Sequence, residues 1–239
     1  MRGQFLADPR HAEVDVAALV SGGLDEMTDI QAAPSGAEQV PHGDTVGVSA
    51  ADGNGYAVSL IQSVFWAFGS GLIDPATGVL FHNRGTSFSL DAASPNVLAP
   101  RKRPLHTLMP VMTTRGGALS HVLSTMGGQG QPQILAQVLL RAVRGATAEQ
   151  AVSAPRAIVG AQVDGATADS VTVESDLAEV ARAAVANISV EPIVVPAHTD
   201  DMGHTNVVFI AGDGAMTAAS DPRSDGAAAV AGWDGHAEQ

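Results

Sequence analysis

The sequence predicts an α+β fold, a sandwich in which layers of strands and helices pack together. Three observations predict it: short apolar segments separated by turn residues come first, helical patterns occupy the middle, and two apolar segments end the chain. Strands, then helices, then strands suit such a sandwich because each sheet and each helix has an apolar face to bury. The 239 residues, of which 45% are hydrophobic and 15% charged, suffice for a substantial core.

Residues 1–44 differ from the rest of the chain. After an acidic stretch, a run rich in Pro, Gly and Ala extends from Ala32 to Asp44 without helical or strand periodicity. Such a run is typical of an exposed linker. We therefore expect a tail and linker over residues 1–44 and one folded domain over residues 45–239.

Two pairs of strands are expected in the first half of the folded region. Val46–Ala51 and Tyr56–Val64 are separated by the turn sequence Asp-Gly-Asn-Gly, a strong hairpin signal. Leu108–Thr114 and Leu119–Thr125 are joined by a second turn that contains two glycines. A further short strand is expected over Gly78–His82.

Helical patterns follow these strands. After Pro132, apolar residues recur at helical spacing, and Gly145 suits the C-terminal cap. Thr147 opens the capping-box sequence Thr-Ala-Glu-Gln of a short helix that must end near Pro155. A third helix, with one apolar face, is expected after Ser175. The last strands are expected over Asn206–Ala211 and Met216–Ser220.

The composition excludes several classes of function. The net charge is −13 and the most basic cluster is only Arg101-Lys102-Arg103, so we expect no nucleic-acid partner. The absence of cysteine excludes disulfides, thiolate metal sites and a cysteine nucleophile. No apolar run reaches the roughly 18 residues of a membrane span. We favour a cytoplasmic location, and a signal peptide on an upstream segment is the alternative.

Thr45 is the candidate nucleophile. A threonine hydroxyl needs a base to take its proton, and the α-amine does so where threonine is the first residue of a mature chain. The ordinary pKa of that amine, about 7.7–8.0, suits the task at neutral pH. Thr45 begins a predicted strand directly after the linker, which is the expected arrangement for a residue released by cleavage after Asp44. An ordinary strand-start threonine would have the same local sequence.

Short motifs follow Thr45 in a fixed order. They are Asp52-Gly53-Asn54, Ala57-Val58-Ser59, Phe68-Gly69-Ser70-Gly71, Thr77-Gly78, Asn83-Arg84, Lys102-Arg103-Pro104-Leu105, Gly127-Gly128, Ala154-Pro155-Arg156 and Ser220-Asp221-Pro222-Arg223-Ser224. Together they resemble the small subunit of γ-glutamyltransferases, from Thr45 to about Gly232. Residues 5–44 resemble the tail of that family's large subunit.

The resemblance implies a fold and a chemistry. The fold is a four-layer αββα sandwich of the N-terminal-nucleophile hydrolase class, partly incomplete here because most of the large subunit is absent. The expected partner is the large-subunit chain of the same precursor, in a heterodimer. The precursor would cut itself between Asp44 and Thr45, and Thr45 would then form an acyl-enzyme with an amide substrate, as in glutathione hydrolysis. No cofactor or metal ion is implied.

The resemblance also assigns catalytic roles. Gly127 and Gly128 match paired glycines whose backbone N–H groups form an oxyanion hole in the family, although a tight turn needs the same glycines. Ser63 matches a hydroxyl residue that hydrogen-bonds the nucleophile, and its alternative role is the polar face of a half-buried strand. Gly47 stands where a histidine commonly follows the nucleophile by two positions.

The substrate-binding positions depart from the family. Those that would hold the α-amino group of a γ-glutamyl substrate read Phe65, Arg84 and Ser87, and a Ser-Ser pair near the α-carboxylate is replaced by His106-Thr107. Arginine suits a planar carboxylate rather than an ammonium. The segments Asn83–Asp91, Leu105–Thr107 and Met126–Gln133 resemble a divergent branch of the family that includes oxamate amidohydrolase. That resemblance implies that Arg84 and His106 bind a small carboxylate substrate. The alternatives are a structural salt bridge for Arg84 and a buried core histidine for His106.

Three functions stay open. The first is an amidohydrolase acting on γ-glutamyl or other small carboxylate-bearing amides. The second is hydrolysis of oxamate-type or larger acyl amides without γ-glutamyl activity, for which Phe65 and Trp66 could line an apolar pocket. The third, of another class, is a truncated, non-catalytic subunit.

Two further runs of polar residues are not expected to be sites. The histidines and aspartates between His198 and His204 fit no known zinc spacing, so we expect a loop without metal. The run from Ser220 to Ser224 is expected to be a structural turn.

Overall fold

The computed structural model describes residues 45–188 and 190–230, which fall into two compact units. One unit comprises residues 84–106, and the other comprises the remaining described residues. Each is described by itself below. The expected tail and linker, residues 1–44, lie outside the described residues. Among the described helices, none combines the length and apolar character that crossing a membrane requires.

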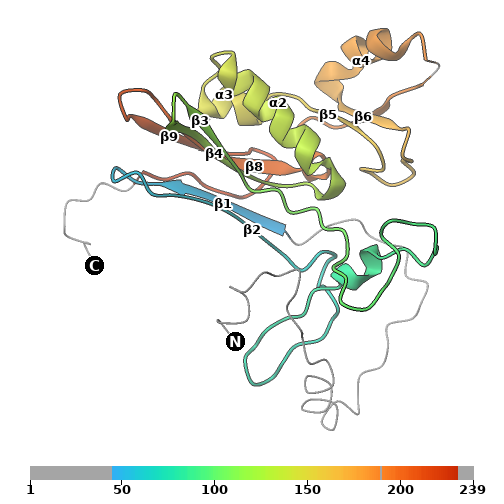
Figure 1. Cartoon of the computed structure of the whole chain (residues 1–239). Helices are drawn as coiled ribbons and strands as arrows, with labels where there is room; N and C mark the ends of the chain where they lie inside the picture. The colour runs from blue at the N-terminus through green and yellow to red at the C-terminus, as the bar shows by residue number, and fades with distance from the viewer. Residues whose placement is uncertain (1–44, 189, 231–239) are drawn as a thin grey trace. The chain divides into compact units, whose positions relative to one another are not determined.

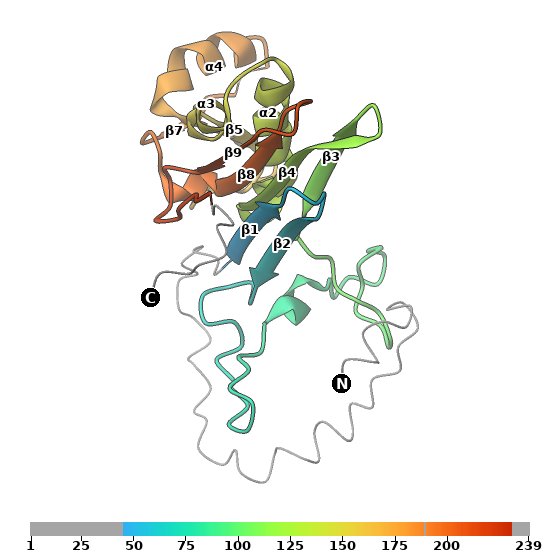
Figure 2. The same ribbon diagram turned by 90° about the vertical axis from the view of Figure 1, so that its left-hand side faces the viewer.

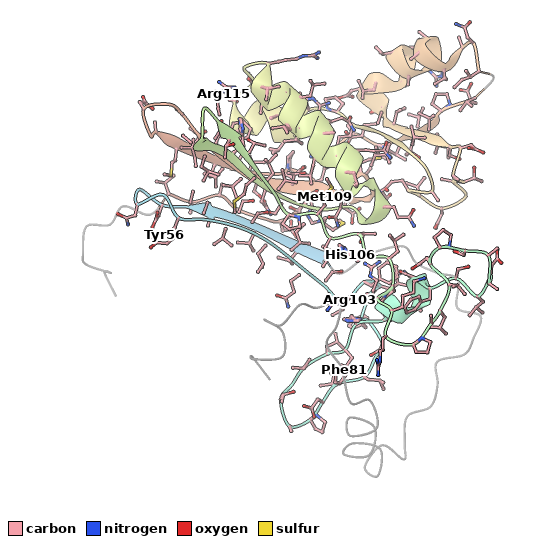
Figure 3. The ribbon with its side chains drawn as sticks, viewed as in Figure 1. Tyr56, Phe81, Arg103, His106, Met109 and Arg115 are labelled. Atoms are coloured by element: carbon pink, nitrogen blue, oxygen red, sulfur yellow. The ribbon has the colours of Figure 1, made fainter. Side chains whose placement is uncertain are left out.

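The larger unit begins with a hairpin. β1 (Thr45–Ala51) pairs antiparallel with β2 (Ala57–Ser63) over their full lengths. In the turn, the Asp52 carboxylate accepts the N–H groups of Asn54 and Tyr56, each at 2.9 Å. Figure 3 shows Tyr56 at this end of the hairpin. The predicted hairpin is therefore confirmed, and its first strand begins at Thr45.

A four-stranded antiparallel sheet forms the centre of the same unit. Its strand order is β3-β4-β8-β9. In Figure 3, Met109 lies just before β3 and Arg115 at its far end. All four strands were expected from the sequence. Their bounds are Val111–Arg115 for β3, Ala118–Met126 for β4, His204–Ile210 for β8 and Met216–Ser220 for β9.

Two helices cover one face of this sheet (Figure 1). α2 spans Gln131–Val143, and α3 spans Ala148–Ser153 with the complete capping box at Thr147. α2 begins slightly earlier than expected, because Pro132 occupies its first turn, where a missing N–H costs nothing. The helices and the sheet share a buried apolar core made of Leu123, Leu135, Val138, Ala148, Ala151, Val152, Val207 and Ala219.

The β1–β2 hairpin covers the other face, which gives the order helices, four-stranded sheet, two-stranded sheet (Figure 2). Polar groups join the two sheets: Ser49 Oγ lies 2.9 Å from Ser124 Oγ, and Ser59 donates to Leu123 O at 2.6 Å. The sheets approach closely at Gly47, where an added Cβ would lie 2.9 Å from Ser124 Oγ. A larger residue there would force Ser124 or the facing backbone to shift.

A small third sheet was not anticipated. It has the order β5-β6-β7, formed by Ala157–Val159, Val171–Glu174 and Ile193–Val195. These strands are three or four residues long, too short to show an alternating pattern. The expected helix after Ser175 is confirmed as α4 (Ala178–Val185), although none of its residues is buried.

The strand expected over Gly78–His82 was wrong. This stretch contributes only an isolated bridge between Ile73 and Leu80. Gly78 has φ +70° and donates its N–H to Asp74 O at 2.8 Å, which closes a turn where the strand was expected to start. Phe81, labelled in Figure 3, is 50% exposed, so its apolar character does not mark a buried strand.

The smaller unit, residues 84–106, contains little regular structure. A single turn of 3-10 helix spans Arg84–Ser87, and one bridge joins Ser89 to Val97. Asn96 holds the segment together, because its side chain donates to Ser87 O at 2.6 Å and accepts the Leu105 N–H at 3.2 Å.

Candidate functional site

Thr45 is the first residue of β1, and its side chain meets Ser63 at the last pair of the hairpin. The register pairs Thr45 with Ser63, and Thr45 Oγ1 donates a hydrogen bond to Ser63 Oγ at 2.7 Å. Ser63 Oγ also accepts the N–H of Phe65 at 3.0 Å. The Thr45 hydroxyl is thereby fixed in one direction at the point where β1 begins.

The contacts of β1 fix the direction in which it crosses the central sheet. Asn206 of β8 donates to Gly47 O at 2.7 Å, and Ser49 donates to Asn206 O at 2.8 Å. Farther along β1, Ala50 to Gly53 line a groove together with Val208. β1 therefore runs in the same sense as β8. His204, at the start of β8, pairs with Met126, at the end of β4. Thr45, at the start of β1, therefore lies at the Met126 end of β4. In Figure 1, α2 begins at this same end of the sheet.

Gly127 and Gly128 follow β4 directly and lead through the 3-10 turn Gly128–Gly130 into α2. Their φ angles are +147° and +53°, which only glycine adopts readily. Neither N–H donates a hydrogen bond to any described residue. Backbone N–H groups in folded proteins are almost always paired, so two adjacent donors without a partner among the described residues suit an anionic oxygen.

The loop holding these glycines is packed tightly on one side. A Cβ on Gly127 would collide with Ile134, and a Cβ on Gly203 would collide with Met126 O and Ile134. Gly203 has φ +69° and lies against Gly127. Gln162 donates to Asp201 O at 2.7 Å and to Gly127 O at 3.5 Å. The conformation of the loop is therefore set by its neighbours.

A buried ionic cluster lies next to this tightly packed loop. Arg156, Glu174, Asp221 and Arg223 are all at most 5% exposed. Arg156 pairs with Asp221, and Arg223 pairs with both acids. Burial lowers the pKa of Arg156 to about 10, against the opposing charge of Asp221. Burial also acts to lower the pKa of Arg223, but hydrogen bonds and charges of Glu174 and Asp221 outweigh it and raise that pKa.

The segment after β2 carries the aromatic candidates. Phe65 has φ +82°, a strained conformation for a residue with a side chain, and its ring lies 5.5 Å from that of Trp66. Asn83 secures this segment, because its side chain accepts the Trp66 N–H at 3.2 Å and its own N–H donates to Val64 O at 3.1 Å. The strained Phe65 is thus held two positions after Ser63.

The candidate carboxylate-binding residues lie mainly in the smaller unit. There Arg84 Nη1 donates to Ser87 Oγ at 3.3 Å, and partial burial lowers the pKa of Arg84. His106 is exposed at the end of this unit (Figure 3), so it is not the buried core histidine considered above. Thr107 is half-buried and belongs to the larger unit.

The region from His198 to His204 forms hydrogen bonds within the protein. The His198 N–H donates to Glu174 Oε1 at 2.7 Å, and its ring Nε2 lies 3.0 Å from Ser153 O. His204 is the first residue of β8, and burial lowers its pKa. Over residues 45–188 and 190–230, no group of three or more His, Asp or Glu side chains could hold a metal ion.

Within the larger unit, Ser63 Oγ is hydrogen-bonded to both the Thr45 hydroxyl and the Phe65 N–H, and Gly127 lies at the same end of β1. Their catalytic roles stay predictions. Sequence reasoning missed Gly203 and Gln162, whose importance lies in contacts between segments distant along the chain. A glycine just before a predicted strand was the only available signal for Gly203.

The comparisons with known proteins agree on one family. A family model described as gamma-glutamyltranspeptidase matches residues 1–231. The oxamate amidohydrolase proenzyme of Klebsiella pneumoniae is 36% identical over 235 residues, covering 96% of this chain and 44% of that protein. The glutathione hydrolase-like YwrD proenzyme of Bacillus subtilis is 35% identical over 233 residues, covering 95% of this chain and 44% of that protein. The chain therefore spans less than half the length of these relatives.

A solved structure gives the same result for the fold. A cephalosporin acylase from Bacillus halodurans superimposes with a TM-score of 0.68 at 32% identity, covering 80% of this chain and 34% of that one. The fold is that of the γ-glutamyltranspeptidase and acylase group of N-terminal-nucleophile hydrolases, with mixed α and β content.

Proposed function

The chain belongs to the γ-glutamyltranspeptidase family, and on this premise we propose that it is the catalytic part of an amidohydrolase whose nucleophile is Thr45. The observation that carries the proposal is the placement of Thr45. It is the first residue of β1 and donates to Ser63 at 2.7 Å, at the end of β1 near a loop whose two glycine N–H groups donate to no described residue. A nucleophile and oxyanion donors at one end of one strand are what acyl transfer requires.

We propose that Thr45 becomes a chain terminus by self-cleavage. Thr45 Oγ1 attacks the carbonyl carbon of Asp44, the peptide C–N bond breaks as an ester forms, and water hydrolyses the ester. The Thr45 α-amine is thereby released and can take the hydroxyl proton in later turnovers. Both relatives named above are called proenzymes, which supports a maturation step. Asp44 itself lies outside the described residues.

The Gly127 and Gly128 N–H groups are proposed to stabilise the oxyanion, both in maturation and with substrate. Each acyl transfer passes through a tetrahedral intermediate whose oxygen carries a negative charge, and donors already aimed at that oxygen lower the barrier without reorganisation. Removing one such donor typically costs about 10²–10³ in rate. Support comes from the unused donors and from the tight packing of Gly127.

For the substrate, we propose a small amide that carries a carboxylate. Arg84 would bind the carboxylate in a bidentate arrangement, with His106 and Thr107 nearby in sequence as further polar contacts. Phe65 and Ser87 replace the groups that would accept hydrogen bonds from an α-ammonium, which argues against a γ-glutamyl substrate. The 36% identity to an oxamate amidohydrolase favours an oxamate-like compound. A larger acyl amide is the second candidate, favoured by Phe65 and Trp66 and by the likeness to an acylase.

We propose that the active assembly includes the large-subunit chain of the same precursor. The hairpin turns an apolar face away from the central sheet, with Val46, Val48, Val58 and Leu60 each 44–59% exposed. A contiguous exposed apolar face of a two-stranded sheet is normally covered by another layer. Added strands and helices on this face would complete a four-layer αββα sandwich. The 44% coverage of the relatives is consistent with this missing part.

The proposal is tested on the complete protein by intact-mass analysis and N-terminal sequencing. We expect two chains, the second beginning at Thr45, and a covalent acyl adduct on that chain when an amide substrate is trapped. Thr45→Ala should stay uncut, Thr45→Ser should cut slowly, and Thr217→Ala, at an exposed position of β9, should cut normally. An uncut wild-type chain without any acyl adduct would instead indicate a non-catalytic subunit.

A further inference from the structure

The two peptide groups that carry the proposed oxyanion donors are each held by their carbonyl oxygens. The peptide group is planar and trans, so fixing a carbonyl oxygen fixes the N–H on the opposite side. Gly127 O accepts the Gly130 N–H at 2.9 Å, which aims the Gly128 N–H. Met126 O lies 2.8 Å from Thr125 Oγ1, which aims the Gly127 N–H. The donor of Gly127 therefore depends on a side chain, that of Thr125.

Thr125 is itself held by hydrogen bonds to residues of β8. Its hydroxyl lies 2.8 Å from His204 O as well as from Met126 O, and it accepts a hydrogen bond from Thr205 Oγ1 at 3.1 Å. Thr205 Oγ1 in turn accepts Arg156 Nη2 at 3.5 Å. Thr125, Thr205 and Arg156 are all fully buried, so these bonds do not compete with water.

Arg156 acts on the same loop by a second route. Its Nη1 donates to Gly203 O at 2.5 Å and to Met202 O at 3.3 Å. Gly203 lies so close to Met126 O and Gly127 that no Cβ fits. One guanidinium thus fixes both the hydroxyl that holds Met126 O and the backbone that packs against it.

We propose that Arg156 and Thr125 are positioning residues that aim the Gly127 N–H at the oxyanion. The inference rests on the proposed function, since it needs Gly127 to be an oxyanion donor. A buried ion cluster is in general a weak source of stability, because desolvation offsets the attraction between its charges. The ionic cluster around Arg156 is therefore better explained by the geometry that it imposes on the Gly127–Gly128 loop than by a net gain in folding stability.

The test uses three variants in the complete protein. Thr125→Val removes the hydroxyl at nearly constant shape, and Thr125→Ser keeps it. Thr172→Val is the matched control, because Thr172 is also a fully buried strand threonine, but its hydroxyl bonds to none of the described residues. Two readouts are needed: amide hydrogen exchange of the peptide covering Gly127–Gly130, and kcat and KM together with the rate of cleavage before Thr45.

We expect Thr125→Val to speed exchange in Gly127–Gly130 specifically, and to lower kcat and the cleavage rate at least about tenfold at unchanged KM, as loss of a donor used only in the transition state does. Thr125→Ser should restore both, and Thr172→Val should change neither. Unchanged exchange and kcat in Thr125→Val would refute the positioning role. The positioning role would also be refuted if the losses of kcat and of protection from exchange only followed the loss in the free energy of unfolding. If the wild type neither cuts nor hydrolyses amides, the proposed function fails, while exchange still decides whether Thr125 orders the loop.

Discussion

Thr45 Oγ1 donates a 2.7 Å hydrogen bond to Ser63 Oγ across the last pair of the β1–β2 hairpin. Ser63 simultaneously accepts the N–H of Phe65. The strand that begins with the proposed nucleophile is therefore tied to the segment that carries the strained aromatic residue. A substitution at Ser63 should therefore affect both the orientation of the Thr45 hydroxyl and the backbone at Phe65.

Ser63→Ala should slow cleavage before Thr45 and substrate turnover by about tenfold or more. Without its acceptor, the Thr45 hydroxyl can rotate away from the attacking geometry, and small misplacements of reacting groups are costly. Rates of precursor disappearance on gels and of amide hydrolysis measure the effect.

Ser59→Ala is the matched control for Ser63→Ala. Ser59 lies on the same strand and face, and its hydroxyl joins Leu123 O and the Val111 N–H instead. It should lower stability by about 1–3 kcal/mol, the cost of unpaired buried groups, with little change in rate per folded molecule. Equal losses of rate in both variants would contradict a specific role for Ser63.

Gly203→Ala should destabilise the protein more than the equivalent change in an open turn. At φ +69° a side chain costs about 1 kcal/mol or more, and here its Cβ also collides with Met126 O and Ile134. Gly214→Ala is the control, because Gly214 has φ +86° but nothing lies within 4 Å of its Cβ position. Denaturant unfolding should show a loss at Gly203 at least about 2 kcal/mol larger than at Gly214. Similar losses would mean that the contact with the Met126–Gly127 backbone relaxes easily.

Stability should fall as the pH drops below about 6.5, the ordinary pKa of histidine. Burial, with the nearby Arg115 charge, lowers the pKa of His121, whose Nδ1 lies 2.7 Å from Thr113 Oγ1. A group with a lowered pKa in the folded state binds its proton more tightly in the unfolded state, so acid favours unfolding. The contribution is fully present above about 6.5 and is lost as the pH falls toward the folded pKa.

The measurement for His121 is the free energy of unfolding between pH 8 and pH 5. His121→Gln should flatten the curve below pH 6.5, although burial lowers the pKa of His204 too and leaves part of the slope. His82→Gln, at an exposed position, serves as the histidine-substitution control. A curve that stays equally steep in His121→Gln would contradict the prediction.

Arg84→Ala should impair hydrolysis of oxamate more than that of an uncharged amide. Loss of a carboxylate partner removes a strong, charge-assisted interaction. In the wild type, a γ-glutamyl ammonium about 4 Å from Arg84 would cost on the order of 4 kcal/mol at an effective dielectric of about 20. The complete protein should be assayed with oxamate, glutathione, a γ-glutamyl anilide and a glutaryl amide, with Arg101→Ala as a surface control. If the protein hydrolyses glutathione efficiently and Arg84→Ala leaves that rate unchanged, the result would contradict the proposed substrate and favour a γ-glutamyl substrate.

The sequence predicted most of the larger unit because its elements carry local signals. The Asp-Gly-Asn-Gly turn, the capping box at Thr147 and the cap at Gly145 each act within a few residues, and the structure has all three. Gly78–His82 was mistaken for a strand because apolar residues flank a turn there. The short strands of the third sheet had no periodicity to detect.

The candidate site was predictable only in part. Thr45, Ser63 and the glycine pair were proposed because family motifs mark them, and the structure joins Thr45 to Ser63 while their catalytic roles stay predictions. The chain of hydrogen bonds from Arg156 through Thr205 to Thr125 was not predicted. It joins residues 31 positions apart through hydroxyl groups that follow no pattern in the sequence. The motif around Asp221 was expected to be a turn, and Ser224 N–H does close one onto Asp221 O, but its buried charges also support the loop after β4.

The contact between Gly47 and Ser124 limits which residues β1 can carry at this position. A histidine at Gly47, the residue common in the family, would need its Cβ within 2.9 Å of Ser124 Oγ, closer than real side chains come. Such a side chain would force Ser124 or the facing backbone to shift, and any shift of β1 would move Thr45 with it. The close approach of the two sheets therefore limits the size of the residue that can stand two positions after the proposed nucleophile.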